Sequence, residues 1–131
     1  MGLQLVKKGT TDEFSFDGSG SDPVDVGTVN LDDTGTPPDV DSSIVNAEIL
    51  ATVYDYTGLG MSLITETTGV DYQLSLDGSA FSESISPVDM AGSGGDVRQD
   101  VWIKTIIDND GSVAAGSNVT ADIRLVSTQN Q

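Results

Sequence analysis

Oxygen-bearing side chains gathered in one short segment are the clearest sign of possible chemistry in this sequence. Asp108-Asn109-Asp110-Gly111-Ser112 offers the carboxylate, amide and hydroxyl oxygens that hard cations such as Ca²⁺ accept, with Asp108 and Asp110 as candidate ligands. The same five residues suit a hairpin turn, because Asp and Asn side chains bond nearby amides and glycine tolerates positive φ. An EF-hand needs a longer loop closed by a glutamate, which the residues from Val113 onward do not supply. We therefore expect a turn and no cofactor, with Ca²⁺ as the alternative.

The residues available for catalysis are few in kind. The chain has no cysteine and no histidine, which excludes a thiolate nucleophile, a disulfide framework and a Cys-based metal site. A pair of carboxylates of the glycosidase type is the plausible remaining chemistry. The acidic residues occur mainly in turns and at outward positions, and none is marked by an apolar surrounding that would shift its pKa. We expect a protein that is not an enzyme.

The net charge limits the choice of partner. Twenty-one acidic residues against five basic ones give a formal charge of −16 over 131 residues. Nucleic acid is not an expected partner, because neutralising its backbone requires clustered lysine and arginine. The basic residues are too scattered for this: Lys7, Lys8, Arg98, Lys104 and Arg124. The excess of aspartate has two readings, a carboxylate surface suited to a high-salt habitat and the use of aspartate in turns.

Two targeting signals are missing from the residues given. No stretch approaches the length of a membrane span, so we expect no membrane partner. The opening segment MGLQLVKKGT lacks the long apolar region of a signal peptide. The expectation is a protein that is made in the cytoplasm and stays or assembles there. A mature secreted chain given a new methionine would read in the same way.

Alternating apolar residues predict strands throughout the chain. Val101, Ile103 and Ile107 fall on one face of an extended segment, and Val119, Ala121, Ile123 and Leu125 repeat the pattern after the turn at 108–112. Two such runs joined by a glycine-containing turn predict a hairpin over 100–127. The longest alternation, from Ile44 to Tyr54, places Val45, Ala47, Ile49, Ala51 and Val53 on one face.

Turn residues divide the chain into about seven strands, which is typical of an antiparallel β-sandwich. Asp55-Tyr56-Thr57-Gly58 reads as one of these turns, and Met90–Asp96 as the most flexible interior stretch. The chain length suits one domain. We predict an arm over 1–20, a sandwich over 21–127 and a polar tail over 128–131. The expected strands lie near residues 24–31, 43–54, 60–66, 70–76, 80–86, 98–107 and 118–127.

Two groups of apolar residues are candidate interfaces. The arm carries Leu3, Leu5, Phe14 and Phe16 in two short alternating pieces, which suit either edge strands or a segment that orders on a partner. Trp102 and Ile106 share the face opposite Val101 and Ile103. If the latter face the core, the Trp102–Ile106 pair points outward and becomes a candidate contact surface. The alternative places Trp102 inside and Val101 outside.

Several short segments together resemble bacterial and viral immunoglobulin-like domains of the abnormal-spindle/hydin and choice-of-anchor kind. They are Val26-Gly27-Thr28-Val29, Tyr72-Gln73-Leu74-Ser75-Leu76-Asp77-Gly78, Val101-Trp102-Ile103-Lys104, and Ala115-Gly116 before Val119-Thr120-Ala121-Asp122-Ile123. The resemblance covers roughly residues 24–127 and departs from the family over 57–68 and 91–96. It implies an immunoglobulin-like sandwich used for attachment and scaffolding, without a shared active site.

These observations lead to one expected function and one alternative. The first is a non-enzymatic virion structural protein, either a capsid decoration or a fibre or tail appendage. Its expected partners are other virion proteins or copies of itself in a homo-oligomer, an expectation that rests on analogy. The alternative is an extracellular or cell-surface adhesion or carbohydrate-binding module.

Overall fold

The protein is an antiparallel β-sandwich. The computed structural model describes residues 2–14, 40–63, 69–107 and 123–130, and in these ranges it contains two sheets and one 3-10 turn, η1 (Gly92–Gly94). The first sheet contains β1 (Leu3–Lys7), β2 (Val40–Asp41), β3 (Val45–Ala51), β5 (Val70–Ser75) and β8 (Val97–Ile107). The second contains β4 (Asp55–Leu63), β6 (Ser84–Ile85), β7 (Met90–Ala91) and β9 (Ile123–Asn130). The predicted all-β fold is confirmed.

The strand order is immunoglobulin-like. Strand β8 pairs with β3 and β2 along one edge and with β5 along the other, and β1 pairs with β3. In the second sheet, β9 pairs with β4. The orders β1-β3-β8-β5 and β4-β9 match strands A-B-E-D and C-F of an immunoglobulin domain, with every pair antiparallel. The predicted strand at 24–31 lies outside the described residues.

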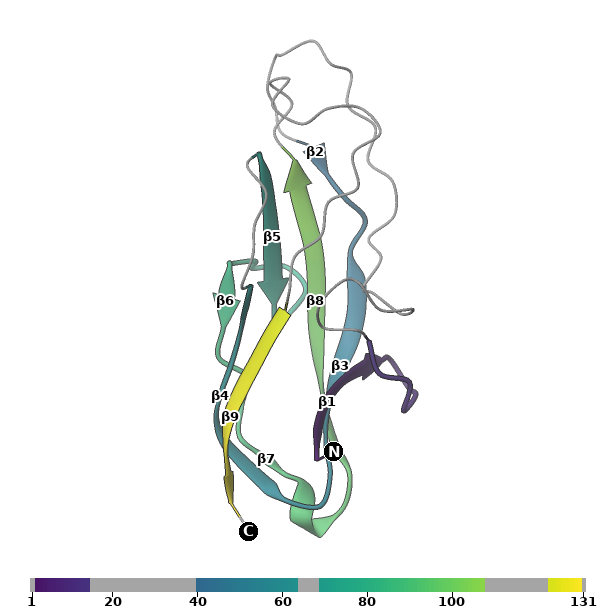
Figure 1. The fold of residues 1–131 in the computed structure, drawn as a ribbon. Coiled ribbons are helices and arrows are strands. Elements are labelled where there is room, and N and C mark those ends of the chain that lie inside the picture. Colours follow the sequence, from purple (N-terminus) through teal and green to yellow (C-terminus); the bar gives the residue numbers. More distant parts are fainter. Residues whose placement is uncertain (1, 15–39, 64–68, 108–122, 131) are drawn as a thin grey trace.

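The predicted hairpin over 100–127 is wrong. Strands β8 and β9 both exist, but β9 pairs with β4 and belongs to the other sheet (Figure 1). The physical reason is that the part of β8 where a hairpin would pair, residues 102–107, has β5 on one side and β3 and β2 on the other. Residues 128–130, predicted as part of a polar tail, continue β9.

The N-terminal segment also differs from the predicted arm. Strand β1 is hydrogen-bonded to β3 in five residue pairs, from Leu3–Ala51 to Lys7–Ala47. The chain then turns back, and Phe14 N–H donates to the Leu5 carbonyl at 2.9 Å. The edge-strand alternative is therefore confirmed for β1. Residues 15–20 lie outside the described part of the chain.

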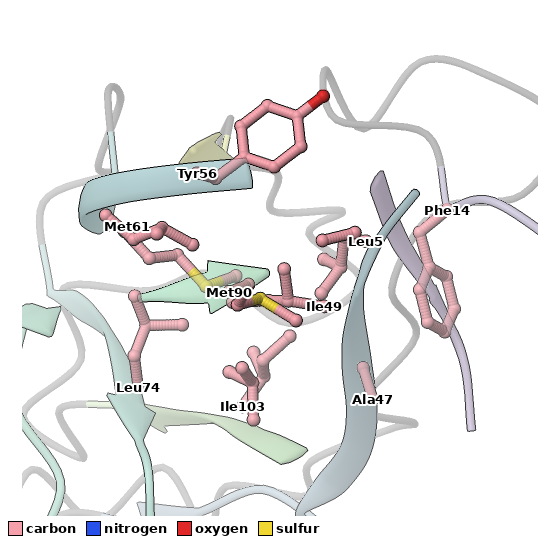
Figure 2. Close-up of a cluster of buried hydrophobic side chains, with 12 residues drawn as sticks. Leu5, Phe14, Ala47, Ile49, Tyr56, Met61, Leu74, Met90 and Ile103 are labelled. Carbon is pink, nitrogen blue, oxygen red and sulfur yellow. The ribbon is translucent and has the colours of Figure 1, made fainter. Parts of the chain in front are cut away.

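The core fills the space between the two sheets. Side chains from β1, β3, β5 and β8 meet side chains from β4 and β7, and Figure 2 shows Leu5, Ile49, Met61 and Met90 converging at its centre. Burial of each large apolar side chain contributes about 1.5–3 kcal/mol to the free energy of unfolding before the entropy of the chain is counted. In β3 the predicted inward residues Ala47, Ile49 and Ala51 are buried in this core, and Leu50 is buried as well although it has the opposite parity. The buried cluster contains Leu5, Phe14, Ala47, Ile49, Ala51, Tyr56, Leu59, Met61, Leu74, Met90, Val101 and Ile103.

A strained turn carries the chain from the first sheet to the second. Tyr54 N–H donates to the Thr52 carbonyl at 2.7 Å around Val53, whose φ is +72°. This is a γ-turn with positive φ, a rare conformation that is especially unfavourable for a β-branched residue. Val53 was expected on the buried face of its strand, but it is 64% exposed. The chain reverses here, and the predicted turn at 55–58 is instead part of β4.

The glycine-rich stretch 90–96 is packed against this turn. Gly92 is buried, and a Cβ added to it would lie 2.6 Å from the Tyr54 carbonyl oxygen and 2.8 Å from the Ala51 carbonyl carbon. Ser93 donates from its hydroxyl to Asp55 Oδ1 at 2.6 Å. This stretch was expected to be the most flexible of the interior because of its glycines. That reasoning left out the close backbone packing that glycine permits because it lacks a side chain.

A bulge interrupts the edge of β8 between β2 and β3. Three residues, 42–44, lie opposite two residues of β8, because Asp41 pairs with Ile106 and Val45 with Ile103. The Ser42 hydroxyl accepts a hydrogen bond from Thr105 N–H at 2.8 Å. The Thr105 hydroxyl is itself buried and has no hydrogen-bond partner among the described residues.

Replacing Val53 with glycine should stabilise the protein. Glycine adopts positive φ without strain, and the gain exceeds the extra entropy of the unfolded chain. We expect Val53→Gly to add about 1 kcal/mol of unfolding free energy and to raise Tm by about 3–6 °C. Val53→Ala is the matched control, because alanine keeps a Cβ at the same φ. Equal melting temperatures for the two variants would contradict the strain.

Replacing Thr105 with valine should also stabilise the protein. The change keeps the side-chain shape and removes a buried hydroxyl without a partner, for an expected gain of about 1 kcal/mol. Urea denaturation should show a higher midpoint with an unchanged m value. In the control Thr10→Val, the lost hydroxyl donates to the Lys7 carbonyl at 2.8 Å, so no gain is expected. A similar gain in both variants would point to hydrophobicity alone.

Candidate protein-interaction surface

The outer face of the first sheet presents aromatic and basic side chains from β8. Val101 and Ile103 are buried in the core, so the intervening Trp102 and the following Lys104 and Ile106 lie on the opposite face. This is the orientation that the alternation favours. We define the β8 patch as Ile44, Phe81, Trp102, Lys104 and Ile106.

Trp102 is half-buried against a turn from the neighbouring strand. It is paired with Asn46 of β3 and with Ser75 of β5, which places it in the middle of the sheet. A Cβ added to Gly78 would lie 3.2–3.4 Å from three atoms of the indole ring. The Asn46 amide donates to the Val101 carbonyl at 3.2 Å and so lies folded onto the backbone. The indole is thus held by β-sheet neighbours and by the backbone of one turn.

Asp77 organises the turn that supports the indole. Its Oδ1 accepts hydrogen bonds from the N–H groups of Ser79 and Ala80, both at 2.9 Å, and from the Ser75 hydroxyl at 2.9 Å. The Ser75 hydroxyl in turn accepts from Gly78 N–H at 2.9 Å. Gly78 has φ of +79°, a conformation that suits glycine. Its position against the indole therefore depends on the Asp77 carboxylate.

Phe81 follows this turn and meets Lys104. The Lys104 Nζ lies 4.5 Å from the centre of the Phe81 ring, which is the distance of a cation–π contact. Ile44, at the bulge, is 50% exposed. The patch therefore combines two aromatic rings, aliphatic carbon and a lysine held over one of the rings, and aromatic side chains are enriched at the centre of protein interfaces.

Ion pairs occupy the other end of the same face. Arg98 donates to Glu48 at 3.1 Å, and Lys8 donates to Asp100 at 2.5 Å. The hydrogen bond to Asp100 raises the pKa of Lys8 above its usual value. Gly9 N–H adds a hydrogen bond to Glu48 at 2.7 Å. Each of these two carboxylates thus has a cation beside it, so the negative charge next to the β8 patch is locally compensated.

The structure separates the interface residues expected from the sequence. Trp102 and Ile106 lie on the outer face, as expected, and their contact with a partner stays a prediction. Leu5 and Phe14 are buried in the core, at 0% and 8% exposure, and are not available to a partner. Leu3 packs partly buried against that core. The expectation of an interface is therefore corrected for Leu5 and Phe14, because β1 is a strand of the sandwich, and for Leu3 it stays a prediction.

The remaining expected residues lie outside the described part of the chain. They are Phe16 and the candidate metal ligands Asp108 and Asp110. Within the described ranges, no group of three or more acidic residues is placed to hold a metal ion. Those ranges also contain no helix long and apolar enough to cross a membrane.

Strand parity placed Lys104 on the same face as Trp102 and Ile106, but Lys104 was not counted as an interface candidate. Phe81 and Ile44 were not among the candidates either. Phe81 carried no such signal, since its approach to Lys104 depends on how the turn at 75–80 folds back. Ile44 precedes the inward-facing Val45, so the alternation in β3 already indicated the outer face for it.

The turn at Asp77 should lose stability in acid. Hydrogen bonds from the N–H groups of Ala80 and Ser79, and then from the Ser75 hydroxyl, lower the Asp77 pKa from 3.8 to about 2. The folded state thus binds this proton less readily than the unfolded state. The stabilisation is complete above the unfolded pKa of 3.8 and is lost as the pH falls through about 2.

Two variants test this role. Asp77→Asn keeps an acceptor but does not titrate, so its Tm should fall less steeply than that of the wild type between pH 3.8 and about 2. Asp77→Ala removes the acceptor and should lower Tm at neutral pH, with a change in Trp102 fluorescence. Parallel acid profiles for the wild type and Asp77→Asn would show that Asp77 contributes nothing to the pH dependence.

Compared with protein-family models, with curated proteins and with solved structures, the chain matches none of them. A function for this protein therefore has to be argued from its own residues and from their arrangement on the sandwich.

Proposed function

We propose that this protein is a non-enzymatic structural module of a virus particle, which acts through protein–protein contacts. In the particle it forms a capsid decoration or part of a fibre or tail appendage. The observation that carries the proposal is the β8 patch, in which Trp102, Phe81 and Lys104 lie together on the outer face of a sheet whose other face forms the core. Interfaces are enriched in aromatic side chains such as Trp102 and Phe81 and depleted in the carboxylates that dominate this chain.

The framework around the patch supports a binding role. Strand β8 is held on both edges, and the Asp77 hydrogen bonds fix the turn that touches the indole. A partner would therefore meet side chains that are already ordered, which reduces the entropy lost on binding. Scaffolding modules benefit from such a surface because their contacts must persist.

The sequence resemblance supports the class of protein. The strand order agrees with the immunoglobulin-like sandwich that abnormal-spindle/hydin and choice-of-anchor domains imply. Domains of this kind serve attachment and scaffolding. The inference from fold to function is an analogy, and binding to particles is the measurement on which it depends.

A carbohydrate-binding or adhesion module is the second candidate. It is favoured by one observation, the presence of Trp102 and Phe81 on the same patch, because aromatic rings can stack against sugar rings. The two candidates use the same residues but differ in the ligand, so one set of variants distinguishes them.

Co-sedimentation with purified particles tests the proposal. The wild-type protein should pellet with particles of the source virus and saturate a fixed number of sites. Trp102→Ala and Lys104→Glu should each weaken this binding by about tenfold or more, because they remove a central aromatic anchor or reverse the charge beside it. Circular dichroism should verify that both variants stay folded.

Val88→Ala is the control for this experiment. Val88 is 67% exposed and does not belong to the β8 patch, so its truncation should leave particle binding unchanged. Failure of the wild type to bind shells, tails or fibres would overturn the virion proposal. Binding to a glycan array that Trp102→Ala abolishes would replace it with the carbohydrate-binding function.

A further inference from the structure

The second sheet has a long strand, β9, with one edge along which no other strand of the described residues lies. Strand β9 pairs with β4 along one side, and among the described residues no strand lies beside its other side. In the immunoglobulin order, β9 corresponds to strand F, and its neighbour on that side would be strand G. An open edge of this kind presents backbone N–H and C=O groups that can pair with another strand.

The other sheet edges in the described part of the chain belong to short strands or are bridged by hydrogen bonds at one or more positions. Beside β5, Ser82 exchanges two hydrogen bonds with Leu74, at 2.7 and 2.8 Å. Beside β1, Phe14 N–H donates to Leu5, and Lys7 N–H donates to the Asp12 carbonyl at 2.9 Å. Strands β6 and β7 contain two residues each. Natural proteins protect edges in these ways, whereas β9 extends over eight residues.

The edge is also regular. The irregularity between Thr57 and Gly60 places the extra residue in β4, so β9 itself is not the bulged strand. Leu125 packs toward the core, and Val126 lies on the opposite face, 42% exposed, beside Gly60. A strand that pairs with this edge would find a straight ladder and an apolar side chain near its middle.

The charge of β9 favours a second copy of the same chain as the partner at this edge. Residues 123–130, Ile-Arg-Leu-Val-Ser-Thr-Gln-Asn, contain one basic residue and no acidic residue, in a chain whose net charge is −16. Two copies of so acidic a protein repel each other over most of their surface. Along β9 they can approach without placing one carboxylate opposite another.

We propose that β9 pairs antiparallel with β9 of a second copy around a two-fold axis near Val126. The pairing joins the two second sheets into one continuous sheet and brings the exposed Val126 side chains together. It deepens the proposed function by naming a second copy as one partner, and rests on it only for the role of the dimer in a particle. The edge and the β8 patch belong to different sheets.

Sedimentation velocity across protein and salt concentrations tests the dimer. The full chain should dimerise, and dimerisation should strengthen by about tenfold or more from ~0.1 M to ~1 M NaCl, because salt screens the repulsion between two acidic copies. Association driven by attraction between opposite charges would weaken instead. A protein that stays monomeric throughout this range would overturn the proposal.

Matched variants locate the interface. Val126→Glu places a carboxylate on the edge and should weaken dimerisation by about tenfold or more, while Val88→Glu adds the same charge at another exposed site and should leave it intact. Circular dichroism should show both variants folded. Equal dimerisation of the two variants would exclude β9 as the interface.

Hydrogen exchange distinguishes the occupants of the edge. In the wild-type dimer, the outward N–H groups of β9 should be protected at high protein concentration and should exchange after dilution. Protection that persists in a monomer would show that another segment of the same chain covers the edge, and would overturn the proposal. Particle binding is measured separately. If the Val126→Glu variant fails to dimerise but still pellets with particles, the proposed function stands without the dimer. If the wild type dimerises but binds no particles, the dimer stands without the proposed function.

Discussion

Strand β8 is flanked on both of its edges over residues 102–107, by β3 and β2 on one side and by β5 on the other. This double pairing fixes which face of β8 enters the core, since shifting the register by one residue would move Val101 and Ile103 into water. It also excludes β9 from the first sheet and directs it to β4. The two-layer arrangement and the outward position of Trp102 both follow from it.

The connection between the sheets stores strain that the packing around it sustains. Val53 keeps a positive φ, and Gly92 packs closely against the backbone of the same turn. A Cβ added to Gly92 would lie only 2.6 Å from the Tyr54 carbonyl oxygen. Thr52 N–H donates to the Gly2 carbonyl at 2.7 Å, which ties the start of β1 to the same place. Three segments far apart in the sequence thus hold one corner of the sandwich, and a residue type that is unfavourable locally is retained there.

The sequence correctly indicated which face of a strand is buried where one face packs on the core and the other does not. Alternation correctly predicted the inner faces of β3 up to Ala51 and of β8, because a half-buried strand needs an apolar residue at every second position. It was not informative about pairing partners. The segment 108–112 has the composition of a tight hairpin turn, but the partner of a strand depends on which edges remain open, and this is a property of the whole sheet.

The error at the N-terminal end of the chain has a local cause. The polar run after Lys7 was interpreted as a separator between two short pieces of an arm, whereas Gly9, with φ of +76°, begins a reversal that brings Phe14 back onto Leu5. Local polarity indicates a turn equally well in an arm and in a sheet. Of the β8 patch, Trp102, Lys104 and Ile106 follow from parity in β8 and Ile44 from the alternation around Val45, while Phe81 depends on the fold of a turn.

The two surfaces singled out on this sandwich are geometrically independent. The β8 patch lies on the outer face of the first sheet, and the β9 edge belongs to the second sheet, with the core between the two layers. Occupation of the edge would extend the second sheet sideways and leave the outer face of the first uncovered. A module that pairs with a copy of itself through β9 could therefore present two β8 patches at once, and two sites on one dimer bind a repetitive surface more tightly than either site alone. For a protein proposed to decorate or build a particle, this separation of self-association from attachment is the physical feature that makes both possible.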